Sequence, residues 1–237
     1  MSLLSVRNVS KNFGGIVANQ DVSFSLDAGE IVGLIGPNGA GKTTMFNCIA
    51  GYFAPSSGEI YLNDEKISGL SPEQCAHAGI ARTFQVARTF TSMSAQENVM
   101  VGAFLKNKHV ATARQVANDL LEFVNLGKFK DKPAGSMTIS EQRRLAVARA
   151  LAVSPKLLLM DEVMAGLNPT EVKETVEVVL KIRQRGISCL IVEHVLEGIM
   201  PIANAIVVLD YGKKIADGTP QQISNNPQVI AAYLGEE

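Results

Sequence analysis

Apolar and polar residues alternate along the beginning of the chain, over residues 3–26. The apolar positions that carry this alternation are Leu4, Val6, Val22, Phe24 and Leu26. Successive side chains of a strand point to opposite faces, so this period of two predicts a half-exposed antiparallel sheet. A further short strand at residues 59–62 follows the turn at residues 55–58 and is expected to join that sheet.

Three later segments are apolar without interruption, which is typical of strands buried on both faces of a parallel sheet. They are residues 31–35, 157–160 and 189–192. Polar chemistry follows each of them directly: a glycine-rich turn, then Asp161 and Glu162, then Glu193 and His194. Ligands bind outside the carboxyl ends of parallel strands in an open α/β sheet, so the three segments predict one shared site.

The pattern between residues 85 and 154 is helical instead. Residues 109–126 form one amphipathic stretch, and residues 141–153 form another that ends before Pro155. We therefore expect a helical lobe inserted into an α/β core. The remaining predicted elements are a helix at 170–185, strands at 187–192 and 205–209, and a last helix at 227–234.

The glycine-rich turn has the spacing GxxxxGKT and lies between a predicted strand and a predicted helix. In a phosphate-binding loop, glycines let successive backbone N–H groups face one concavity, and the helix N-terminus adds a partial positive charge. Lys42 is expected to reach the β- and γ-phosphates and Thr43 to place its hydroxyl on Mg²⁺. The expected phosphate-binding residues are Gly36, Pro37, Asn38, Gly39, Ala40, Gly41, Lys42, Thr43 and Thr44. A chance glycine-rich turn is the alternative, and it is expected in roughly 1% of chains this long.

Two acidic residues at the end of the second buried segment complete the expected site. Asp161 is placed to hold Mg²⁺, and Glu162 is placed to polarise the attacking water as general base. Alone this pattern is weak, because many strands end in acids at a solvated rim. Together with the glycine-rich loop it indicates a nucleotide hydrolase.

His194 and Gln85 are two further candidates. A histidine at a strand end is more often a surface or hydrogen-bonded residue, but His194 shares its sheet edge with Lys42 and Glu162. We therefore interpret it as catalytic. Gln85 lies where the core passes into the helical lobe, and its neutral amide could touch Mg²⁺ or the water and sense the γ-phosphate.

Composition narrows the classes of function. The net charge is −1 over 237 residues and no basic run stands out, which argues against nucleic acid as a partner. Cys48, Cys75 and Cys189 lack metal-ligand spacing, as expected of reduced cysteines in a cytosolic protein. No apolar run approaches the ~18 residues of a membrane-spanning helix, so we expect a protein that is soluble when isolated.

In this order the motifs resemble those of the ATP-binding-cassette (ABC) ATPases over essentially the whole chain. The resemblance implies that Phe13 stacks on adenine with Ala18 beside it, and that residues 36–43 form the Walker A loop. It also implies that Gln85 is the Q-loop, residues 157–161 the Walker B strand, Glu162 the catalytic base and His194 the switch histidine. The implied D-loop residues are Gly166, Leu167 and Asn168, with Asn168 where the family usually has aspartate.

The resemblance also implies the architecture. The expected fold is α/β, a P-loop NTPase (RecA-like) core with an N-terminal antiparallel β subdomain and an inserted helical subdomain. One domain is expected over residues 1–237. Residues 1–85 are expected to hold the antiparallel β subdomain and the first half of the core. Residues 86–154 are expected to form the helical subdomain, and residues 155–237 the second half of the core and the C-terminal helix.

More narrowly, the chain is similar to the ATPase of Liv-type importers of branched-chain amino acids. The segments that suggest this are residues 79–85, 165–169 with Glu171, 192–194 and 232–235. The similarity implies ATP and Mg²⁺ as ligands, a sister ATPase subunit, two integral membrane permease subunits and an extracytoplasmic solute-binding protein. It also implies a peripheral position on the cytoplasmic face of the inner membrane. Importers of urea or amides, lipopolysaccharide systems, soluble assembly ATPases and P-loop kinases are the alternatives.

The chain departs from the family at the signature sequence LSGGQ. In the family, this segment caps the ATP that is bound by the opposite subunit. The corresponding residues here are Thr138, Ile139, Ser140 and Glu141, so both glycines are replaced. Thr138 and Glu141 still form a capping box, which keeps the helix and its dipole. The close backbone approach that glycine permits is lost. We therefore expect an impaired signature and a heterodimer, and a tolerated variant signature is the alternative.

Residues 90–100 follow Gln85 and mix polar side chains with Phe90, Met93 and Met100. By the same resemblance this segment lines a groove for a helix of the membrane subunits. Ordinary core packing of the helical lobe explains each single residue equally well.

Overall fold

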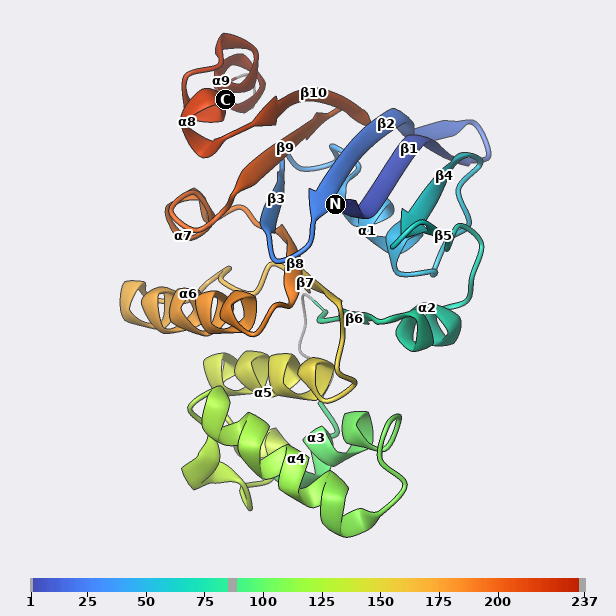
Figure 1. Ribbon diagram of the computed structural model, residues 1–237. Coiled ribbons are helices and arrows are strands. Elements are labelled where there is room, and N and C mark those ends of the chain that lie inside the picture. The colour runs from blue at the N-terminus through green and yellow to red at the C-terminus, as the bar shows by residue number, and fades with distance from the viewer. Residues whose placement is uncertain (1, 85–88, 235–237) are drawn as a thin grey trace.

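The computed structural model describes residues 2–84 and 89–234 of the chain and has an α/β fold (Figure 1). One sheet has four antiparallel strands in the order β2-β1-β4-β5. Its strands are β1 (Ser2–Phe13), β2 (Ile16–Asp27), β4 (Ser57–Leu62) and β5 (Glu65–Lys66). Leu4 pairs with Leu26 and Val6 with Phe24, so the alternating apolar residues share one buried face. The predicted antiparallel sheet is confirmed.

The second sheet has six strands in the order β10-β9-β3-β8-β7-β6. Its strands are β3 (Ile31–Ile35), β6 (Ile80–Arg82), β7 (Leu157–Asp161), β8 (Ser188–Val192), β9 (Ala205–Asp210) and β10 (Lys213–Gly218). All of them except β10 run parallel, which confirms the predicted parallel strands. β6 and β10 were not predicted, because β6 is too short to have a period and β10 is a polar edge strand.

Three helices pack against one another below the sheets in Figure 1. They are α3 (Ala95–Ala103), α4 (Val110–Phe123) and α5 (Ile139–Leu151). The helical pattern in this region is confirmed, although α4 stops before the expected residue 126 because Asn125 has a left-handed φ of 60°. The expected boundaries of the lobe stay a prediction, and residue 85 lies outside the described residues.

The remaining helices connect and flank the strands. They are α1 (Lys42–Ile49), α2 (Pro72–Ala78), α6 (Pro169–Gln184), α7 (Leu196–Ile199), α8 (Pro220–Ser224) and α9 (Pro227–Leu234), with short 3₁₀ turns at Gly127–Phe129 and Ala134–Ser136. α9 has the predicted bounds. α6 begins one residue before the prediction, because Asn168 caps it and Pro169, which needs no N–H partner, takes the first position.

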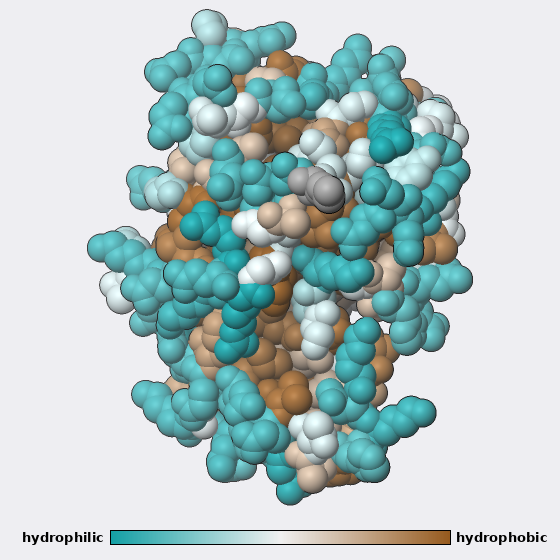
Figure 2. Space-filling model, in the orientation of Figure 1, coloured by the Kyte–Doolittle hydropathy of each residue, from teal (hydrophilic) through white to brown (hydrophobic). Residues whose placement is uncertain are grey.

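The apolar core lies on both faces of the parallel sheet. On one face, Leu34 of β3 packs with Phe46 of α1 and Leu26 of the antiparallel sheet. On the other face, one continuous cluster runs from Ile191 of β8 to Leu145 of α5. On the face drawn in Figure 2, hydrophobic residues are visible mainly in the middle and lower part. Among the described helices, none is long and apolar enough to cross a bilayer.

Candidate active site

The loop between β3 and α1 holds a turn that only glycine fits. Gly36, Gly39 and Gly41 have φ angles of 145°, 78° and 95°, where residues with a Cβ are strained. A Cβ at Gly36 would lie 2.0 Å from the carbonyl oxygen of Leu209, and one at Gly41 would lie 2.4 Å from that of Ala18. The loop is therefore held tightly against its neighbours, and its shape depends on these glycines.

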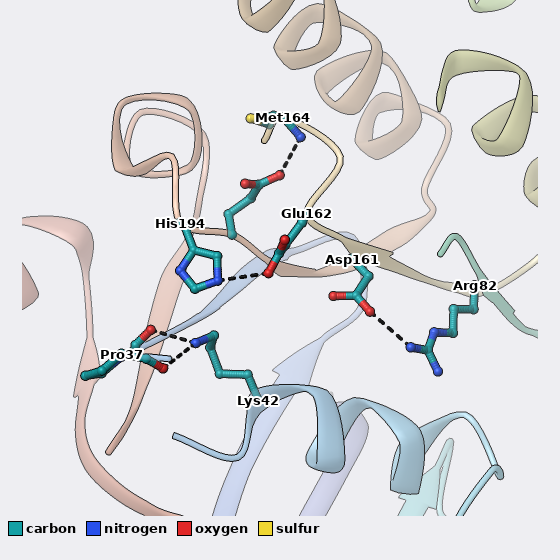
Figure 3. Close-up of polar contacts among 9 residues, drawn as sticks. Pro37, Lys42, Arg82, Asp161, Glu162, Met164 and His194 are labelled. Carbon is teal, nitrogen blue, oxygen red and sulfur yellow. Dashed lines mark hydrogen bonds and ion pairs between the residues drawn. The ribbon is translucent and has the colours of Figure 1, made fainter. Parts of the chain in front are cut away.

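Lys42 is the first residue of α1, and its side chain folds back over this loop. Its Nζ donates to the carbonyl oxygens of Gly36, at 2.7 Å, and of Pro37, at 2.6 Å (Figure 3). The residue is buried. The ammonium group is thus held at the mouth of the loop, where the charge of a phosphate group would meet it.

A cavity of about 290 Å³ opens beside the loop and brings most of the predicted residues together. It is lined by Ile16, Val17, Ala18, Asn38, Gly39, Ala40, Gly41, Lys42, Thr43, Thr44, Glu162 and His194. Residues from β2, the loop, and the ends of β7 and β8 therefore meet at one edge. Ile16 and Val17 were not predicted; their signal is two exposed apolar residues directly after paired glycines.

Phe13 does not line this cavity. Its ring packs edge-on against Phe53, with centroids 5.1 Å apart, and Lys11 Nζ lies 5.0 Å from its centre. The side chain is 41% exposed. The predicted aromatic surface is thus accessible, at the end of β1 where the chain turns into the cavity wall.

Asp161 ends β7 and is buried. Its Oδ2 accepts a hydrogen bond of 3.0 Å from Arg82 Nη2 (Figure 3). Arg82 also donates to Asn47 of α1. Burial raises the pKa of Asp161, and the bond from Arg82 opposes this rise. The bond from Arg82 thus fixes Oδ2, and Oδ1 takes no part in that bond. Arg82 was not predicted.

These residues fit a magnesium ion that is shared with a nucleotide. The described residues contain no group of three His, Cys, Asp or Glu side chains that could hold a metal alone. Mg²⁺ is commonly bound by one or two protein oxygens together with substrate phosphates. Thr43 at the loop and the Oδ1 atom of Asp161 would supply such oxygens. Gln85, the third predicted ligand, lies outside the described residues.

Glu162 and His194 form a hydrogen-bonded pair at the cavity. His194 Nε2 lies 2.9 Å from Glu162 Oε1 (Figure 3). Glu162 has a left-handed φ of 50°, and its N–H donates to the carbonyl of Val192 at 2.8 Å. This backbone bond ties the end of β7 to the end of β8. A carboxylate held by a histidine can accept a proton from a water molecule.

Glu193, between Val192 and His194, points away from this cavity and is fully buried. Its Oε1 accepts a hydrogen bond of 2.7 Å from the N–H of Met164, which Figure 3 draws as the dashed line to Met164. Burial raises the pKa of Glu193 to about 7, against the opposing effect of nearby backbone N–H groups. Among the described residues, Oε2 has no hydrogen-bond partner. From the sequence, Glu193 is expected only as a polar residue that follows a buried strand.

The signature and D-loop residues lie away from the cavity. Thr138 caps α5 and accepts from the N–H of Glu141, and the Glu141 carboxylate accepts from the N–H of Thr138 and from Lys132. The capping box is confirmed. Ile139 is 70% exposed at the first turn of α5. Asn168 caps α6.

A phosphate-binding loop, a carboxylate at the next strand end and a paired glutamate and histidine define the class of P-loop nucleotide hydrolases. A family model described as ABC transporter matches residues 19–165, and one described as branched-chain amino acid ATP-binding cassette transporter matches residues 213–237. The chain is an ATPase that belongs to the ABC transporter family.

Similar proteins cover nearly the whole chain. The high-affinity branched-chain amino acid transport ATP-binding protein BraF of Pseudomonas aeruginosa is 39% identical, over 99% of this chain and 98% of its own. LivG of Escherichia coli, with the same description, is 41% identical over the same shares. The lipopolysaccharide export ATP-binding protein LptB of Haemophilus influenzae is 36% identical, over 100% of this chain and 99% of its own.

Solved structures agree. An ATP-binding cassette of an ABC transporter in its ADP conformation has a TM-score of 0.91 at 29% identity, covering 99% of both chains. A bacterial ABC transporter cassette in a dimeric structure has a TM-score of 0.84 at 25% identity, covering 92% of this chain and 98% of its own. The first of these cassettes is thus described with ADP and the second as a dimer.

From the raised pKa of the buried Glu193 we expect the free energy of unfolding to fall as pH rises. Its folded pKa of about 7 exceeds the ordinary value of 4.5, so its contribution is complete below pH 4.5 and is lost as pH rises to 7. This difference corresponds to about 3 kcal/mol. Denaturant unfolding should therefore find that Glu193→Gln gains stability relative to the native chain between pH 5 and 7.5. The exposed Glu177→Gln is the control, and equal pH profiles for Glu193→Gln and the native chain would contradict the assignment.

Proposed function

We propose that the chain hydrolyses ATP to power an importer of branched-chain amino acids. The observation that carries the hydrolysis is the meeting of Lys42, Glu162 and His194 in one cavity at the carboxyl edge of the parallel strands. The solute is supported by the names of the relatives and by the family model matched at residues 213–237.

The residues of the cavity would each act on a different part of the reaction. Lys42 would exchange the carbonyls of Gly36 and Pro37 for phosphate oxygens. Glu162 would take a proton from the water that attacks the γ-phosphorus, while the bond to the β–γ bridging oxygen breaks. His194 would donate to Glu162 and hold its carboxylate toward that water.

The ligands are ATP and Mg²⁺. Thr43, Gln85 and Asp161 would hold the ion, which neutralises phosphate charge when bound. The accessible ring of Phe13 would stack on adenine, with Ala18 beside it. The hydrogen bond from Arg82 to Oδ2 fixes the plane of the Asp161 carboxylate. The direction of Oδ1 would therefore be fixed as well.

The assembly would contain a second cassette, because the signature of one subunit faces the ATP of the other. Ile139, exposed where the family has glycine, would keep the backbone away from the γ-phosphate. A sister ATPase with an intact signature would then complete the pocket built on Lys42 and Glu162. D-loop residues Gly166, Leu167 and Asn168 would lie at this interface.

Two integral membrane permease subunits would join the cassettes at the cytoplasmic face of the inner membrane, and an extracytoplasmic binding protein would deliver the solute. A cavity of about 430 Å³ between the core and the helical lobe would receive a segment of a permease. Its walls include Tyr52, Phe90 and Val101, which are 47%, 46% and 42% exposed. Apolar side chains left exposed around a cavity are typical of a protein-binding surface.

Replacing the general base tests the hydrolytic mechanism. Glu162→Gln should lower ATP hydrolysis of the assembled transporter by about 10²–10⁴-fold, because the amide cannot accept the proton. Phosphate release measures the rate, and a fluorescent ATP analogue should bind with unchanged affinity. Glu177→Gln, an exposed acid on α6, is the control. Full hydrolysis by Glu162→Gln would refute the assigned role.

Replacing the signature residues tests the asymmetric assembly. Glu162→Gln alone should stay monomeric with Mg·ATP in size-exclusion chromatography with light scattering. Adding Ile139→Gly and Ser140→Gly should produce an ATP-dependent dimer, since the backbone could then approach the γ-phosphate. Ile139→Ala, which keeps a Cβ, is the control. An ATP-dependent dimer of Glu162→Gln itself would mean that the native signature works.

The solute is tested with the co-expressed transporter in liposomes. Binding protein loaded with leucine should stimulate ATP hydrolysis several-fold, and urea should not. Stimulation by lipopolysaccharide instead would assign the chain to an export system such as that of its 36% identical relative. Failure to co-purify with integral membrane proteins would favour a soluble assembly ATPase.

A further inference from the structure

Glu193 is a buried acid directly beside the Glu162–His194 pair. Its side chain is fully buried and does not line the nucleotide cavity, although its neighbour His194 does. Burial raises its pKa, and Oε2 has no hydrogen-bond partner among the described residues. A buried acid that is only partly hydrogen-bonded costs stability. Such a cost is commonly tolerated where a group serves the chemistry of a site.

The hydrogen bond of Glu193 joins two segments that both carry candidate catalytic residues. Its acceptor atom Oε1 is 2.7 Å from the N–H of Met164, two residues beyond Glu162. Glu193 itself directly precedes His194. The bond therefore holds the segment after the general base against the turn that presents the histidine.

The same segment is anchored from a second side. Arg143 of α5 donates to the carbonyl oxygens of Val163 and Ala165. Met164 lies between these two residues, so Arg143 and Glu193 together fix a stretch that continues into the D-loop at residues 166–168. Under the proposed function, α5 and the D-loop are the parts that contact the second cassette.

We propose that Glu193 is a positioning residue, which holds the segment from Glu162 to the D-loop against the turn that presents His194. Through this contact, docking of a second cassette on the D-loop would affect the geometry of the Glu162–His194 pair. This inference rests on the proposed function. The essential property of Glu193 is the reach of its acceptor oxygen to the Met164 N–H. Its negative charge is not required.

Three substitutions separate reach from charge. Glu193→Gln keeps the acceptor oxygen at the same reach and removes the charge. Glu193→Asp keeps the charge but is one methylene shorter, and Glu193→Ala removes both. Ser188→Ala is the matched control, because Ser188 is buried at the start of β8, the strand that Glu193 directly follows, and its hydroxyl accepts a backbone bond from Gly29 at 2.8 Å.

The assembled transporter should separate these variants by kcat. Glu193→Asp and Glu193→Ala should lower kcat by about 10–100-fold with the KM for ATP within twofold, because a small displacement of the catalytic pair is costly while the phosphate loop is intact. Glu193→Gln should restore kcat to within threefold of the native value. Hydrogen exchange of the peptide over residues 162–168 should be faster in Glu193→Asp and unchanged in Glu193→Gln.

Other outcomes would overturn the proposal. Loss of kcat in Glu193→Gln would mean that the charge acts, and native kcat in Glu193→Asp would mean that the bond to Met164 is dispensable. If Glu193→Ala does not fold, Glu193→Asp and Glu193→Gln still decide, with Ser188→Ala reporting the effect of lost stability alone. Failure of the proposed function is distinguishable, because the native transporter and its Glu162→Gln variant would then hydrolyse ATP alike.

Discussion

The site depends on the parallel pairing of β3, β8 and β7. Leu34 pairs with Val192, and Val192 pairs with Asp161, so three strands end at the same level. That register alone brings together a loop from residue 36, a glutamate at 162 and a histidine at 194. The bond from the N–H of Glu162 to the carbonyl of Val192 extends the pairing one residue beyond β7. A shift of one residue in this pairing would turn the side chains to opposite faces of the sheet.

Arg82 and Glu193 extend the same principle beyond the strands. Each is a charged or ionisable group that sits beside a catalytic residue and bonds to a different element: Arg82 to Asp161 and to α1, Glu193 to the segment after β7. The groups expected to contact the substrate are thus few, while those that fix them are Arg82 on β6, Arg143 on α5 and Glu193, the residue after β8. Tight packing of such supports is what limits small displacements in a reaction centre.

The sequence was sufficient to predict the parts whose chemistry is local. Fewer than ten consecutive residues define each of these parts: the loop at Lys42, the acids at the end of β7 and the capping box at Thr138. The bond between Glu193 and Met164 could not be predicted in this way, because it joins residues 29 positions apart through packing. Arg82 was missed because β6 is only three residues long. The structure brings Lys42, Glu162 and His194 into one cavity. The roles assigned to them, like those assigned to Phe13, Gln85 and the D-loop residues, stay predictions.

The position of Lys42 has a consequence for how a nucleotide enters. Its ammonium group already has two oxygen partners, the carbonyls of Gly36 and Pro37. Under the proposed role of Lys42, a phosphate would replace these carbonyls on a cation that the loop already holds in place, and the lysine would not have to be recruited from solvent. Binding would then exchange the two carbonyl oxygens around the ammonium group for phosphate oxygens. The Lys42 side chain would lose little conformational freedom on binding, because it is already held. The carbonyl oxygens of Gly36 and Pro37 would hold the ammonium group in place until negatively charged phosphate oxygens replace them.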